Sequence, residues 1–160
     1  MRPSILALSV LLAGACYDPV HADEVAALGP ETPGIPEGPT HRAGQRCTTC
    51  HGGRGPSDTE YSLAGTVSRT RGKPEPLVDG TVSFTDAAGK TISATTNSVG
   101  NFWITKDSFD PVFPVRVTLQ GEGIFRRMTT SIGRDGGCAT CHRAEGSDPQ
   151  HTGPIFLRLE

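Results

Sequence analysis

The feature that most limits the fold of this 160-residue chain is its central stretch, residues 61–132, where apolar and polar residues alternate in short segments. Clusters rich in Gly, Asp and Asn separate these segments at 86–89, 97–100 and 120–123. Alternation with a period of two is typical of a β-strand with one buried face. The clusters favour turns between antiparallel strands. We therefore predict a β-sheet domain, since no segment has a helical repeat longer than about two turns.

Six strands are expected in this stretch, each marked by apolar residues on one face. In chain order, the marker residues are Leu63 and Val67; Val82 and Phe84; Ile92 and Ala94; Phe102 and Ile104; Val115, Val117 and Leu119; and Ile124 and Met128. An antiparallel β-sandwich is the natural closure, because each sheet then buries its apolar face against the other. With 35% hydrophobic residues, the chain can build one modest core.

The same stretch resembles the carboxypeptidase regulatory-like, or transthyretin-like, sandwich. The resemblance rests on Gly65-Thr66-Val67, Pro76, Val82-Ser83-Phe84, the turn 86–89, Thr95-Thr96 and Gly100-Asn101-Phe102. It implies an all-β fold and no particular chemistry. Phe102 and Trp103 are neighbours on one predicted strand, so only one of them can enter the core.

The N-terminal residues are typical of an export signal. Arg2 precedes an apolar stretch, 5–12, and small residues follow up to Cys16. The apolar stretch is too short to cross a bilayer, so residues 1–15 are expected to be a signal peptide. Leu12-Ala13-Gly14-Ala15-Cys16 resembles the lipobox of bacterial lipoproteins. The resemblance implies a lipid on Cys16 and a place in the bacterial cell envelope, at the outer membrane or the periplasmic face; ordinary cleavage is the alternative and also exports the protein.

Residues 16–40 show almost no apolar periodicity and contain prolines at positions 30, 33, 36 and 39. Such proline spacing favours an extended chain over packed structure. We expect a disordered, lipid-anchored tether here.

Two copies of one cysteine–histidine motif flank the predicted sandwich. They are Cys47-Thr48-Thr49-Cys50-His51 and Cys138-Ala139-Thr140-Cys141-His142. On a helical turn, residues three and four apart share one face, so each motif brings two thiols and an imidazole together. Both motifs resemble the haem-attachment sequence of c-type cytochromes.

That resemblance implies two covalently attached c-type haems. Their thioethers would form with Cys47, Cys50, Cys138 and Cys141, and their proximal iron ligands would be His51 and His142. His41, shortly before the first motif, and His151, shortly after the second, are the predicted distal ligands, although each fits an ordinary loop histidine too. His21 and Met128 are weaker candidates, because they fall in the tether and in a predicted strand.

The strand count also predicts where the two motifs lie. Each antiparallel turn reverses the chain, so an even number of strands between the motifs returns both to the same end of the sandwich. Six strands would place the two haems close together, and seven would separate them.

The sequence thus predicts a signal peptide at 1–15, a tether at 16–40, a first haem segment at 41–60, a sandwich at 61–132, and a second haem segment with a tail at 133–160. The function implied is an extracytoplasmic dihaem cytochrome that relays electrons between redox proteins. It would be an electron carrier rather than an enzyme, with no small-molecule substrate. A net charge of −2 without a long basic block gives no reason to expect nucleic acid.

Two alternatives stay open. In the first, one haem iron keeps an open position, as in a peroxidase or a gas sensor. In the second, the protein carries no haem and is a surface binding or scaffold module, whose Cys-x-x-Cys pairs form disulfides or bind zinc.

Overall fold

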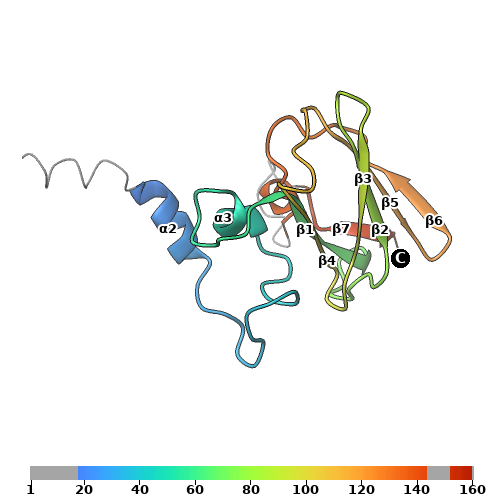
Figure 1. Cartoon of the computed structure of the whole chain (residues 1–160). Coiled ribbons are helices and arrows are strands. Elements are labelled where there is room, and N and C mark those ends of the chain that lie inside the picture. Colours follow the sequence, from blue (N-terminus) through green and yellow to red (C-terminus); the bar gives the residue numbers. More distant parts are fainter. Residues whose placement is uncertain (1–17, 144–151, 160) are drawn as a thin grey trace, which may run out of the picture.

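The structure, a computed structural model, describes residues 18–143 and 152–159. In this part of the chain, seven strands form two sheets that face each other, and two short α-helices lie at one side of them (Figure 1). The elements in chain order are α2 (Pro19–Ala27), α3 (Cys47–His51), β1 (Tyr61–Thr70), β2 (Thr81–Thr85), β3 (Thr91–Thr95), β4 (Asn101–Thr105), β5 (Arg116–Gly121), β6 (Ile124–Arg127), the 3-10 helix η2 (Cys138–Thr140) and β7 (Ile155–Arg158). The prediction of a β-sandwich is confirmed by these two facing sheets.

The two sheets differ in size and in strand direction. One contains the strands in the order β4-β1-β7, and the other contains β3-β2-β5-β6. The six predicted strands correspond to β1 to β6, and the pairs among them are antiparallel. The seventh strand, β7, was not predicted and pairs with β1 in parallel, with Val67 opposite Ile155. The expectation of a wholly antiparallel sandwich is therefore wrong at this edge.

The core lies between the two sheets and is built from the alternating residues of their strands. Its buried members are Leu63, Val67, Leu77, Val82, Phe84, Phe102, Ile104, Phe109, Val115, Leu119 and Leu157. Phe84 and Phe102 join the two sheets, with ring centroids 5.8 Å apart. Trp103 is only partly buried, so Phe102 is the member of this pair that enters the core.

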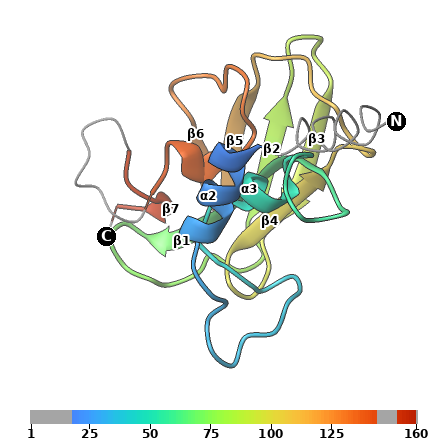
Figure 2. The ribbon, with the colours of Figure 1, turned by 90° about the vertical axis from the view of Figure 1, so that its left-hand side faces the viewer.

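The described part of the predicted tether is folded. Asp18 caps α2, because its carboxylate accepts a hydrogen bond from the backbone N–H of His21 at 3.1 Å, and Pro19 occupies the first helical turn. Figure 2 shows α2 and α3 together in front of the strands. Residues 19–27 of the expected tether therefore form a helix that the sequence analysis did not predict.

Arg42 fastens the segment that follows α2. Its guanidinium donates to the Glu31 carboxylate at 2.7 Å and to the backbone carbonyls of Leu28 and Gly29. The side-chain amide of Asn101, on β4, donates to the His41 carbonyl at 3.0 Å. These bonds hold residues 28–42 against the sandwich, despite their many prolines.

Among the helices of the described ranges, none is long and apolar enough to cross a bilayer.

Candidate functional site

The first motif forms the whole of α3, so its predicted helical turn is confirmed. The chain enters at Arg46 in an extended conformation and leaves at Gly52, where the helix ends. Thr49 turns into the protein, whereas Cys47, Cys50 and His51 line a cavity of about 610 Å³. A cavity of this size lies within the range of small-molecule and cofactor sites.

The ring of His51 is oriented by the loop after α3. Its Nδ1 lies 2.9 Å from the backbone carbonyl of Thr59, and a carbonyl can only accept, so Nδ1 carries the proton. The other nitrogen, Nε2, then holds the lone pair that a metal needs. The ring also stacks on Tyr61, with centroids 4.1 Å apart and planes inclined by 6°, and Tyr61 in turn stacks on Trp103.

His41 lines the same cavity as His51. The centroids of the two imidazole rings are 6.1 Å apart, and their planes are inclined by 56°. Two imidazoles on opposite sides of one metal ion have centroids about 6 Å apart, given metal–nitrogen bonds of about 2.0 Å. The ring spacing is therefore compatible with both imidazoles binding one metal ion. The carboxylate of Glu31 lies 3.8 Å from His41 Nδ1.

Several buried polar atoms in the segment of α2 and α3 have no hydrogen-bond partner. Within residues 18–143 and 152–159 they are His21 Nε2, Glu31 Oε2, His41 Nδ1, Arg46 Nε and Thr48 Oγ1. Glu31, His41 and Arg46 line the cavity, whereas His21 and Thr48 do not. Buried polar groups nearly always have partners, so these three residues are the ones that a group bound in the cavity would satisfy.

The second motif begins in η2 and continues as a turn. The backbone N–H groups of Cys141 and His142 both donate to the Cys138 carbonyl, at 3.2 and 2.9 Å. His142 repeats the arrangement of His51, because its Nδ1 lies 3.1 Å from the Gly153 carbonyl and 3.1 Å from Thr152 Oγ1. In both motifs, then, a backbone carbonyl accepts from Nδ1, so Nε2 is the ring nitrogen that is left to bind a metal.

The thiols of the two motifs differ in exposure. All four cysteines in the described residues are free, and Cys141 is exposed. Burial raises the pKa of Cys138 to about 12, with a further contribution from the nearby Cys47. Burial also raises the pKa of Cys47 and of Cys50. The raised pKa favours the protonated form of the Cys138 thiol in the folded protein.

The two motifs lie next to each other on β1. Helix α3 contacts β1. The segment leading to η2 pairs with β1 as well, because the Ala64 N–H donates to the Gly136 carbonyl at 3.0 Å. Six strands separate the motifs along the chain, as expected, and β7 comes after the second motif.

Among the predicted site residues, Cys16 and His151 lie outside the described residues. His21 lies on α2, with Nδ1 3.7 Å from Glu24.

No three His, Cys, Asp or Glu side chains converge on a common metal position within the described ranges. A zinc ion bound only by the protein needs three or four such ligands. A haem iron needs only one or two, because the porphyrin supplies the others. His41 and His51 supply two imidazoles, which is the number that a haem iron takes from a protein.

Three arginines surround a second, shallower cavity of about 580 Å³, which Ile124 and Leu159 also line. They are Arg71, Arg126 and Arg158. Figure 1 shows the ends of β6 and β7, where this groove lies, on the side of the sandwich away from α2 and α3. Arg71 and Arg126 both lie over the ring of Phe156, 5.8 and 5.5 Å from its centroid.

Comparisons of the chain with models of known families, with curated proteins and with solved structures found no match.

Proposed function

We propose that the protein is an exported dihaem c-type cytochrome that carries electrons between redox proteins. The observation that carries the proposal is the common geometry of the two motifs. Each holds free thiols beside a histidine whose Nδ1 donates to a backbone carbonyl, as metal-binding histidines do. Disulfide staples would explain the cysteine pairs but not the oriented histidines.

The residues have defined roles in this proposal. Cys47 and Cys50 hold one haem and Cys138 and Cys141 the other, through thioether bonds to the vinyl groups, and His51 and His142 bind the irons. His41 is the distal ligand opposite His51, supported by the 6.1 Å ring spacing. When bound, haem supplies reversible one-electron chemistry, and two histidine ligands favour a lower potential than a methionine does.

The finer features of the fold and location belong to the same proposal. A transthyretin-like sandwich is supported by two facing sheets and by the turn pattern of residues 61–132. Export and a lipid on Cys16 are supported by the N-terminal sequence, and covalent haem attachment also requires export. Since α2 begins three residues after Cys16, the lipid would keep α2 close to the membrane surface.

The arginine groove is the surface we propose for an acidic redox partner. Two of its arginine side chains are held in place by other residues. Arg126 Nε donates to the Leu157 carbonyl at 2.6 Å, and Arg158 pairs with Glu122. Complementary charge mainly speeds the encounter of two proteins. Retention on an immobilised poly-glutamate column should fall when Arg71 and Arg126 are both changed to Glu. The control Arg54→Glu/Arg116→Glu carries the same change in net charge, and equal losses would contradict this surface.

The central experiment is the intact mass and visible spectrum of the protein produced with a haem-attachment system. We expect added mass equal to two haems that survives denaturation, and a low-spin spectrum after reduction. Changing Cys47 and Cys50 to Ala, or Cys138 and Cys141 to Ala, should each remove one haem. A colourless protein without added mass would overturn the proposal and leave a haem-free binding module.

A further inference from the structure

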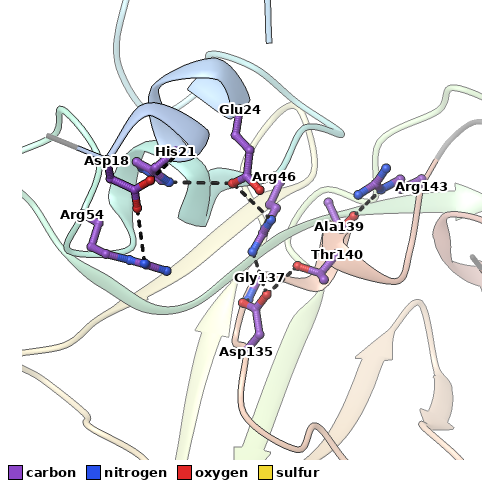
Figure 3. Close-up of polar contacts among 10 residues, drawn as sticks. All are labelled: Asp18, His21, Glu24, Arg46, Arg54, Asp135, Gly137, Ala139, Thr140 and Arg143. Atoms are coloured by element: carbon purple, nitrogen blue, oxygen red, sulfur yellow. Dashed lines mark hydrogen bonds and ion pairs between the residues drawn. The ribbon is translucent and has the colours of Figure 1, made fainter. Parts of the chain in front are cut away.

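One ion pair connects the two motifs across 89 positions of the chain. Arg46, the residue directly before Cys47, donates from Nη2 to the carboxylate of Asp135 at 3.0 Å. Both side chains are about two-thirds buried. Figure 3 shows that this contact continues from Arg46 toward Glu24 of α2. Neither residue belongs to a motif. Arg46 directly precedes the first motif, and Asp135 lies three residues before the second.

Asp135 also sets the shape of the second motif. Its Oδ1 accepts the Gly137 N–H at 2.8 Å, and its Oδ2 accepts the Thr140 hydroxyl at 2.7 Å (Figure 3). These bonds tie the residues on both sides of Cys138 to one carboxylate. The same group thus shapes one motif and binds the flank of the other.

Glycines allow the motifs to approach closely. A side chain at Gly137 would collide with Thr48 Oγ1, the second residue of the first motif. A Cβ at Gly65, on β1, would lie 2.8 Å from the Cβ of Cys138, closer than real Cβ contacts. The two segments are therefore packed directly on each other and on β1.

We propose that Asp135 is a positioning residue that locks the two haem-attachment segments together, so that the attached haems form one interacting pair rather than two independent centres. This inference rests on the proposed function. It assigns the locking to the Arg46–Asp135 contact, because a contact between residues shortly before the two motifs fixes the position of both attachment points. Replacing Asp135 should loosen the pair without removing either haem.

The test uses circular dichroism of the Soret band, which becomes bisignate when two haems lie close in a fixed orientation. We expect a bisignate band in the protein with two haems, and a simple band in each variant that lacks one pair of motif cysteines. Asp135→Asn should keep both haems by mass and reduce the bisignate amplitude at least twofold. Asp58→Asn, an exposed aspartate near the first motif, should leave the band unchanged.

Arg46→Gln is the second variant, because it removes the contact between the motifs and keeps the bonds from Asp135 to Gly137 and Thr140. It should reduce the amplitude as Asp135→Asn does. Two haems whose spectrum equals the sum of the two single-haem variants would overturn this inference alone, as would full amplitude in both Asp135→Asn and Arg46→Gln. A chain without haem mass would overturn the proposed function as well.

Discussion

The imidazoles of His41 and His51 share one cavity, with their ring centroids 6.1 Å apart. Nine residues, which include the start of α3, separate the two histidines in sequence. The side-chain amide of Asn101 donates to the His41 carbonyl at 3.0 Å and so holds the backbone of His41 in place. In the proposed dihaem cytochrome, His41 is therefore the residue whose loss should change one iron centre without affecting attachment of the haem.

If the protein carries the two proposed haems, His41→Ala should convert one of them from low spin to high spin, because the iron that His51 binds would lose its second imidazole. Intact mass should still show two haems, and about half of the low-spin signal should remain in the electron paramagnetic resonance spectrum. His21→Ala, in α2, should leave the spectrum unchanged. A fully low-spin His41→Ala protein would show that another residue binds this iron.

Leu157 tests the unpredicted strand β7, since it is 0% exposed between the two sheets. Leu157→Ala should lower the free energy of unfolding by about 2–5 kcal/mol, the range for truncating a buried leucine. Leu159→Ala, two residues later and 56% exposed, should change it by less than about 0.5 kcal/mol. Urea unfolding measures both, and equal effects would argue against burial of this strand.

The haem-free protein should lose stability in alkaline solution because of Cys138. An unfolded thiol releases its proton near its ordinary pKa of 9.0, whereas the folded thiol keeps it to about 12. Between these values the unfolded state binds fewer protons, so stability is complete below the unfolded pKa and falls as the pH rises. The raised pKa values of Cys47 and Tyr61 act in the same direction.

Thermal unfolding of the reduced, haem-free protein at about pH 8 and about pH 10.5 measures this effect. Cys138→Ser removes the titrating thiol, so the loss between the two pH values should be smaller in this variant. An identical loss would show that Cys138 does not have the raised pKa.

Arg42 is expected to control the order of the segment after α2. Arg42→Ala removes its bonds to Glu31, Leu28 and Gly29, so residues 28–41 should become several-fold more sensitive to limited proteolysis. Arg54→Ala, whose side chain is 79% exposed, is the matched control. Unchanged cleavage in Arg42→Ala would mean that the bonds from Asn101 and the prolines order this segment without Arg42.

Local patterns explain which parts of the fold were predictable. Strands β1 to β6 follow from alternation and turn residues, which act between near neighbours. Strand β7 is a short apolar run, Ile155-Phe156-Leu157, without alternation, and its partner β1 is distant in sequence. Helix α2 has no clear apolar face, and its one visible signal is the capping pair Asp18-Pro19.

The site shows the same division. The motif residues and their helical turns were predictable, because Cys-x-x-Cys-His is a contiguous pattern. The bond from His51 to Thr59 depends on how a loop folds back, and the Arg46–Asp135 pair joins distant positions. Such contacts leave no periodic pattern in the sequence, so only the structure shows them.

The parallel pairing of β7 with β1 has a consequence for the order of folding. The three-stranded sheet cannot be completed until residues 155–158 are available to pair, because β7 is its edge strand. Both cysteine motifs precede β7 in the chain. In the proposed cytochrome, both attachment segments would therefore be synthesised before the strand that completes this sheet.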